Sequence, residues 1–116
     1  MRLVFFTLCS FLSFSLFSQT WNQLIPQGTI EPRANASMVY HPTEHAIYLF
    51  GGQTAEGRQN DLWKLDLADN SWSEVMVVGN IPPIRHTQDA VLDEMNNQML
   101  IFSGQGNGLY LSLIHI

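Results

Sequence analysis

The hydrophobic pattern of residues 34–78 predicts β-strands throughout, because its apolar stretches are short and show no helical spacing. Turn residues separate the stretches: Pro42 disfavours a helix, Gly51 and Gly52 end the second stretch before a polar loop at 53–60, and an Asp-Asn pair stands at 69–70. The expected strands are residues 34–40, 46–50, 62–67 and 71–78. Four short strands joined by tight turns predict a meander, the unit of one propeller blade.

The same pattern returns about fifty residues later in the chain. Residues 32–53 align without a gap with residues 84–105. Identical residues recur 52 positions apart in this alignment: Arg33 and Arg85, Val39 and Val91, Phe50 and Phe102, Gly52 and Gly104, Gln53 and Gln105. Trp21 and Trp72 are 51 apart, and each precedes a Gly, Ile, Pro and Arg in that order. A repeat of this length is typical of propellers and other arrays.

The N-terminal segment differs from the rest of the chain. Residues 3–17 are almost wholly apolar, Arg2 precedes them, and Ser18 follows before the polar Gln19. This order predicts a secretory signal peptide that is cut after Ser18. The apolar stretch is shorter than the roughly 20 residues that span a bilayer, so we expect no membrane span after cleavage. The expected location is secreted, periplasmic or at the cell surface.

Composition narrows the possible partners. The formal net charge is −5, and removal of Arg2 with the leader leaves ten acidic and four basic residues without a basic cluster. An acidic chain of this kind argues against nucleic acid as a partner. Cys9 is the single cysteine and leaves with the leader, which excludes disulfides and thiol catalysis in the mature segment.

Candidate chemistry is sparse. His41 and His45 are four residues apart, a spacing that on a helix would let both bind one zinc ion. Here they flank a hairpin turn, so the spacing does not predict a zinc site. The glycines of 104–108 precede no helix, so they do not predict a phosphate-binding loop. Asp89, Asp93 and Glu94 lie near one strand end, but Asp93 and Glu94 match the turn at His41 and Pro42 in the first unit, which favours a hairpin tip over a glycosidase pair. We therefore predict no catalytic residue, no metal site and no cofactor.

The motif set resembles the kelch repeat. Its marks in the first unit are Arg33, Phe50-Gly51-Gly52, Asn60-Asp61-Leu62-Trp63, Asp66 and Trp72, and in the second Arg85-His86 and Ile101-Phe102-Ser103-Gly104. The residues expected to form the structural motif are Gly51, Gly52, Trp63, Asp66, Trp72 and Gly104. Ser103 replaces the first glycine of the second pair, and we expect a negative φ there because serine then fits without strain.

The resemblance implies an all-β, kelch-type β-propeller, of which about one and a half blades of four antiparallel strands are present. In that family the first strand of each blade lies nearest a central channel and the fourth lies outermost. Carried over, residues 34–40 and 86–92 would line the channel, and Trp63 and Trp72 would pack between blades. Trp21 to Leu24 would be a fourth strand that completes another blade.

We expect this organisation to be incomplete, because repeat arrays need about three units for stability. The expected parts are a signal peptide at 1–18, a partial propeller at 19–110 and a tail at 111–116 that resembles translated adapter sequence and lacks the third-strand motif. Within the propeller, 19–31 form a lone outer strand and linker, 32–78 the first full repeat and 79–110 the start of the second. We interpret the chain as an N-terminal fragment that is poorly folded or self-associates on its own.

Arg33, Arg85 and His86 are the ligand-binding candidates. An Arg fork can pair both oxygens of a carboxylate, and in kelch domains that bind peptides, arginines on loops at this face grip acidic groups. The resemblance therefore implies an exported platform that binds a protein, peptide or carbohydrate. The alternative that each arginine pairs with an acid or backbone group of a neighbouring blade stays open.

Two other functions stay open at this point. One is a secreted propeller enzyme, either a copper oxidase similar to galactose oxidase or an enzyme that processes sialic acid, with its active site in further blades. The copper type needs a tyrosine joined to a cysteine, and the mature segment has no cysteine. The other is a surface-anchored adhesin.

Overall fold

The structure is a computed structural model that describes residues 19–106 and 111–116, with side chains for 19–106 and Ile116. The predicted leader at 1–18 lies outside the described residues. The described part contains strands and no helix, so it has no helix that could cross a membrane. The strands are β1 (Ser37–His41), β2 (Ala46–Thr54), β3 (Gly57–Asp66), β4 (Ser71–Val75), β5 (Arg85–Asp93), β6 (Gln98–Gly106) and β7 (Leu111–His115). The all-β prediction is confirmed.

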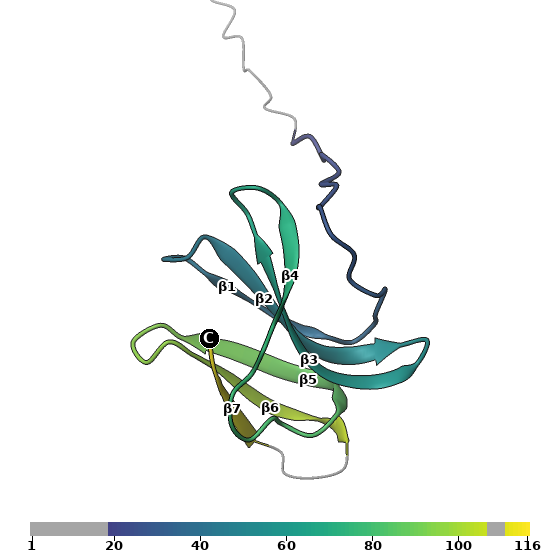
Figure 1. The fold of residues 1–116 in the computed structure, drawn as a ribbon, viewed down its shortest axis with the longest axis vertical. Coiled ribbons are helices and arrows are strands. Elements are labelled where there is room, and N and C mark those ends of the chain that lie inside the picture. Colours follow the sequence, from purple (N-terminus) through teal and green to yellow (C-terminus); the bar gives the residue numbers. More distant parts are fainter. Residues whose placement is uncertain (1–18, 107–110) are drawn as a thin grey trace, which may run out of the picture.

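The strands form two antiparallel sheets, and in each sheet strands that are consecutive in the sequence lie side by side (Figure 1). The first sheet has the order β1-β2-β3-β4 and the second has the order β5-β6-β7. Left-handed backbone conformations recur at equal positions of the two repeats: Asn35 and Thr87 (φ 56 and 57), His45 and Asn97 (50 and 54), Gly51 and Ser103 (61 and 63), Gly52 and Gly104 (94 and 92). The 52-residue repeat is therefore a repeat of backbone conformation, and each sheet corresponds to one blade.

The glycine pair does not end the second strand, as the sequence pattern had indicated. β2 continues through Gly51 and Gly52 to Thr54, with a register shift between Phe50 and Gly52, and β3 begins at Gly57. A bulge with positive φ lets the strand bend and continue. The expected polar loop at 53–60 is therefore a tight hairpin, in which the Thr54 hydroxyl accepts from the Glu56 N–H and donates to the Gly57 carbonyl, both at 3.2 Å.

The expectation of a negative φ at Ser103 is wrong. Its φ is +63°, matching the +61° of Gly51 in the first repeat. The bulge therefore requires a positive φ at this position in both blades, whether glycine or serine occupies it. A non-glycine residue here stores backbone strain of about 1–2 kcal/mol.

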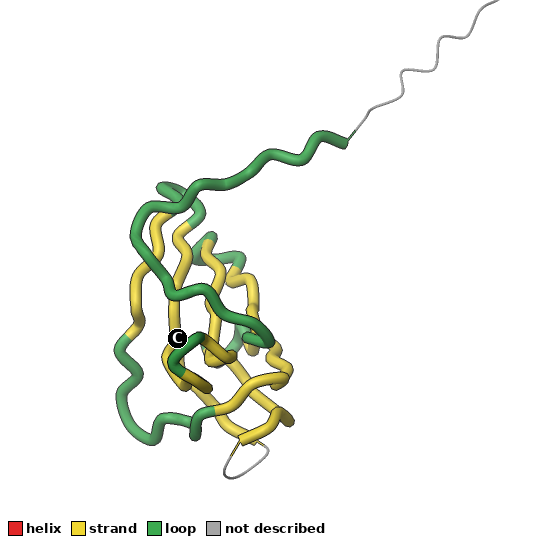
Figure 2. The backbone as a smooth tube through the Cα atoms, turned by 90° about the vertical axis from the view of Figure 1, so that its right-hand side faces the viewer, coloured by secondary structure: helices red, strands yellow, loops and turns green. Residues whose placement is uncertain are grey.

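The ends of the described chain differ from the expected strand pattern. Residues 21–24 form no strand, and Trp21 is 97 % exposed, because no described strand lies beside them to accept their backbone hydrogen bonds. Figure 2 shows the segment before β1 as a loop that leaves the body of strands. Its completion of another blade stays a prediction. Residues 111–115, set apart from the repeat above, pair with β6 as a third strand.

The hydrophobic core lies between the two sheets. We call the face of the first sheet that meets the second sheet its back face, and its opposite face the front face. The second sheet packs its own front face against this back face, and its back face is turned away. The back face of the first sheet contributes Val39, Ala46, Tyr48, Phe50 and Leu62, and the front face of the second sheet contributes Ala90, Leu92, Met99 and Ile101.

Polar side chains also connect the two sheets. His41, which is 4 % exposed, donates from Nε2 to Asn97 Oδ1 at 2.7 Å, while its Nδ1 accepts from the Glu44 N–H at 3.3 Å. Gln88 Nε2 donates to the Phe50 carbonyl at 2.8 Å. β5 contacts β1, β2 and β3, and its contact with β1 brings the first strands of both blades together. The lining of a central channel by the first strands stays a prediction.

Candidate functional site

A row of polar residues crosses both sheets at the end where the two candidate arginines lie. In the first sheet Ala34 bridges to Gln53, which pairs with Arg58, and in the second His86 pairs with Gln105. The two halves are joined where the Thr87 N–H donates to the Asn35 carbonyl at 3.0 Å. We call this surface the polar rim; its members are Asn35, Gln53, Arg58, His86, Thr87 and Gln105.

Backbone strain is concentrated where the rim crosses from one blade to the other. Asn35 and Thr87 both have positive φ, and both are exposed. Asn adopts this conformation readily, but for a β-branched residue such as threonine it is a true outlier. The Thr87 hydroxyl donates to the neighbouring His86 carbonyl at 2.6 Å. Strained residues of this kind gather at binding and catalytic sites, where the surrounding structure holds them.

His86 lies half-buried in the rim. Its Nδ1 is 3.3 Å from the Gln105 carbonyl oxygen. A carbonyl can only accept, so the bond requires the proton on Nδ1, and in the neutral ring Nε2 is then an acceptor. Among the described residues Nε2 has no hydrogen-bond partner. The imidazole therefore presents one fixed and one open nitrogen.

Arg33 lies under the rim and is held by an internal ion pair. Its Nη1 and Nη2 donate to the two oxygens of Asp61 at 2.6 and 2.9 Å, and Nη1 also donates to the Gly51 carbonyl at 2.9 Å. The Arg33 side chain is only 5 % exposed. Burial raises the pKa of Asp61, but the hydrogen bonds from Arg33 and the Trp63 indole outweigh it, so this pKa is lowered overall. The fork holds β3 against the entry to β1.

Arg85 repeats part of this arrangement in the second blade. Arg33 donates from Nε to the Glu31 carbonyl, two residues back, and Arg85 donates in the same way to Pro83, both at 3.3 Å. Arg85 Nη1 donates to the Ser103 carbonyl, the counterpart of Gly51. The residue is 2 % exposed, and burial lowers the pKa of its guanidinium. Both arginines thus bind the bulge of their own blade, and ligand contact by either one stays a prediction.

The structural motif residues act through turns and backbone approach. Asp66 Oδ1 accepts from the Ala68 N–H at 2.8 Å and closes the β3–β4 turn. A Cβ on Gly52 would lie 2.9 Å from the Ala34 carbonyl oxygen, and one on Gly104 would lie 2.9 Å from the Gln88 Cβ. Trp63 and Trp72 are half-buried on the front face of the first sheet, so their contact with another blade stays a prediction.

Arg58 is the rim residue that the sequence analysis missed. It is exposed, and its side chain has no hydrogen-bond or ion-pair partner among the described residues. Residues 53–60 were expected to form a polar loop, and a loop assignment does not predict which side chains lie opposite one another. Its cross-strand pairing with Gln53 is visible only once the hairpin register is known.

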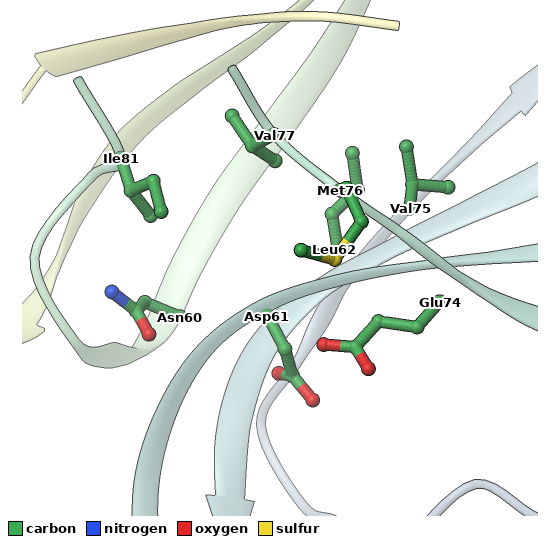
Figure 3. A pocket seen from close by; sticks show the side chains of 8 residues that line it. All are labelled: Asn60, Asp61, Leu62, Glu74, Val75, Met76, Val77 and Ile81. Carbon is green, nitrogen blue, oxygen red and sulfur yellow. The ribbon is translucent and has the colours of Figure 1, made fainter. Parts of the chain in front are cut away.

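A cavity lies between β3, β4 and the connection from β4 to β5 (Figure 3). Its apolar members Leu62, Val75 and Val77 also belong to or pack on the core between the sheets. Asp61 and Glu74 supply carboxylates on one side, and Asp61 is already bound by Arg33. Within the described residues no three His, Cys, Asp or Glu side chains come together as metal ligands.

The fold and the rim define a repeat protein built of propeller blades. The KLHDC2/KLHL20/DRC7 kelch-repeats domain model matches residues 6–116. The chain therefore belongs to the kelch-repeat family, which the sequence motifs had indicated. The about one and a half blades expected from the sequence correspond to the two sheets described.

Similar curated proteins are several times longer than this chain. It is 30 % identical to the mouse Rab9 effector protein with kelch motifs over 95 residues, which are 80 % of this chain and 24 % of that protein. It is 31 % identical over 104 residues to the tip elongation aberrant protein 1 of Schizosaccharomyces pombe, covering 78 % and 9 %. It is 32 % identical over 89 residues to human host cell factor 2, covering 72 % and 11 %. The chain thus spans a quarter or less of these relatives.

Proposed function

We propose that this chain forms part of an exported kelch-repeat protein that binds a protein, peptide or carbohydrate partner through the polar rim. The observation that carries the proposal is the strained junction of Asn35 and Thr87, which joins the polar ends of two blades into one exposed surface. A rigid sheet scaffold with polar residues at its loop end is the usual arrangement of a binding module. A relative whose name describes it as an effector of Rab9 supports a protein partner.

The chemistry of the rim favours a partner that carries a carboxylate or another oxygen-rich group. Arg58 offers a guanidinium fork without an internal partner, and the open nitrogen of His86 can accept or, when protonated, donate. Gln53 and Gln105 add amide groups on either side. Arg33 could join them only by exchanging its bonds with Asp61, so we assign the first contact to Arg58.

Binding is tested with the full chain as the target of a phage-displayed peptide library and of a glycan array. Enriched ligands should lose about tenfold or more in affinity with Arg58→Ala, since a charge-assisted hydrogen bond contributes about 1.5–3 kcal/mol. Glu94→Ala is the control, because Glu94 is exposed in the turn at the opposite end of β5. Ligands that bind both variants equally, or the absence of any enriched ligand, would contradict the rim as the site.

Export has a separate test. The apolar segment at 3–17 followed by Ser18 supports a cleavable leader. The chain is expressed with its own N-terminus, and the mass of the protein recovered outside the cytoplasm is measured. A mature N-terminus at Gln19 is expected. Retention of the whole chain inside the cell, with Met1 or Arg2 still present, would refute export.

A further inference from the structure

The segment that precedes the first blade is exposed and makes no hydrogen bond to the described strands before Gln27. Residues 19–25 are exposed, and none of residues 19–26 belongs to a strand. The Gln27 N–H donates to the Asn70 carbonyl at 2.7 Å, and the Gln27 carbonyl accepts from the Trp72 N–H at 2.9 Å. Gln19 therefore lies on an arm that is tied to the first sheet only from Gln27 onwards (Figure 2).

Removal of the leader gives Gln19 a free α-amine. This step rests on the export proposed above, in which the peptide bond between Ser18 and Gln19 is cut. Such an amine is partly unprotonated at neutral pH, and the unprotonated form is a nucleophile. The first charged residue after Gln19 is Glu31, so no carboxylate close by in the sequence holds the amine in its protonated form. A glutamine in this place also carries its own electrophile, because the carbon of its side-chain amide can reach the α-nitrogen.

We propose that Gln19 is a modification site, at which the exported chain acquires an N-terminal pyroglutamate. The α-nitrogen attacks Cδ of the same side chain and forms a new N–C bond, while the bond from Cδ to Nε2 breaks. Ammonia leaves with one proton from the α-amine, and a lactam ring closes through N, Cα, Cβ, Cγ and Cδ. Nothing is oxidised or reduced, and no co-reactant is consumed. Both reacting groups belong to one residue, which gives them a high effective concentration.

The surroundings of Gln19 permit this ring closure. The reaction needs rotation about the side-chain bonds, so that the amide carbon turns back towards the α-nitrogen. The Gln19 side chain is exposed and has no hydrogen-bond partner among the described residues, so its amide is not held away from that nitrogen. Gln88 shows the opposite case, since it is buried and its Nε2 donates to the Phe50 carbonyl at 2.8 Å. An amide fixed in that way could not turn back.

The lactam protects the arm from aminopeptidases, because these enzymes need a free α-amine. Exposed chain ends outside secondary structure are preferred sites of proteolysis. Trp21 to Leu24, the segment predicted to complete another blade, comes just after Gln19 and would be among the first residues removed. The modification therefore keeps this predicted outer strand intact after export.

The test is mass spectrometry of the full chain, expressed with its own leader and recovered outside the cytoplasm. Trypsin digestion of the denatured protein releases residues 19–33 as the N-terminal peptide, because Arg33 is the first basic residue after Gln19. After incubation of the protein at neutral pH, most of this peptide should be lighter than its sequence by one ammonia molecule and should not react with an amine-labelling reagent. An aminopeptidase added to the undigested protein should leave residues 19–26 in place.

Two variants separate ring closure at Gln19 from other losses of ammonia. The side chain in Gln19→Asn is one methylene shorter and would have to close a smaller, strained ring, so this variant should keep its full mass and its free amine, and the aminopeptidase should shorten the arm. Gln23→Asn leaves the terminal residue unchanged and should still cyclise. A chain that begins at Gln19 and keeps a free amine after incubation would overturn the inference while export stands, as would a chain cut at another residue. A chain that still begins at Met1 or Arg2 would overturn both.

Discussion

The ion pair between Arg33 and Asp61 is the interaction whose loss should destabilise the first blade most. Asp61→Asn keeps the shape of the side chain and removes its charge, which leaves a guanidinium that is 5 % exposed without its carboxylate. Removal of one partner of a fully buried pair costs about 3–5 kcal/mol. The Asp61 side chain is 22 % exposed, so solvent screening reduces the expected loss to about 2–3 kcal/mol.

Thermal unfolding of the full chain, followed by circular dichroism at one protein concentration, measures this loss. A change of about 1 kcal/mol shifts Tm by roughly 4–8 °C in a domain of this size, so Asp61→Asn should lower Tm by about 10 °C or more. Glu44→Gln is the matched control, since the Lys64–Glu44 pair has a similar N–O distance, 2.7 Å against 2.6 Å, but its side chains are 26 % and 32 % exposed. It should lower Tm by only a few degrees, about 1 kcal/mol at most. Equal shifts for the two variants would refute the argument from burial.

Three further predictions concern acid and the bulge. The pKa of Asp61 is lower in the folded state than its unfolded value near 3.8, so the stability that its carboxylate contributes is complete above pH 3.8 and is lost as pH falls through the folded pKa. In Asp61→Asn, the free energy of unfolding in urea should therefore depend less on pH in this acid range. Gly52→Ala should cost about 1–3 kcal/mol in urea unfolding, since φ is +94° and the new Cβ would meet the Ala34 carbonyl at 2.9 Å. Ser103→Gly should raise the free energy of unfolding by about 0.5–1 kcal/mol, because glycine relieves the strain of the left-handed conformation but also increases the conformational entropy of the unfolded chain. A loss of stability would show that the serine is not strained.

The sequence predicted the repeat because the repeat is set by local conformation. Arg33 and Arg85 recur together with a left-handed residue two positions later, Asn35 and Thr87. The same 52-residue spacing therefore appears in the sequence and in the backbone φ angles. Short apolar stretches bounded by turn residues identified the strands for the same reason, since each strand needs only its own alternation and its own ends.

The bulge was missed because its meaning depends on the neighbouring strand. Gly51 and Gly52 read as a strand end when only their own flexibility is considered. In the structure the Ala34 segment lies against Gly52, and the strand continues in a shifted register to Thr54. No local signal distinguishes a glycine that stops a strand from one that lets a second backbone approach. The error hid the β2–β3 hairpin and, with it, the position of Arg58.

The arrangement of the arginines also decides how binding at the rim should be tested. Arg33 carries the internal fork to Asp61, so its substitution changes stability whether or not it meets a ligand. A loss of binding in Arg33→Ala would therefore not separate contact from support. Arg58 has no internal partner among the described residues, and its removal changes only the charge that the rim presents. Binding that falls with Arg58→Ala at unchanged Tm can come only from the surface, whereas binding and Tm that fall together in Arg33→Ala follow from the ion pair beneath it.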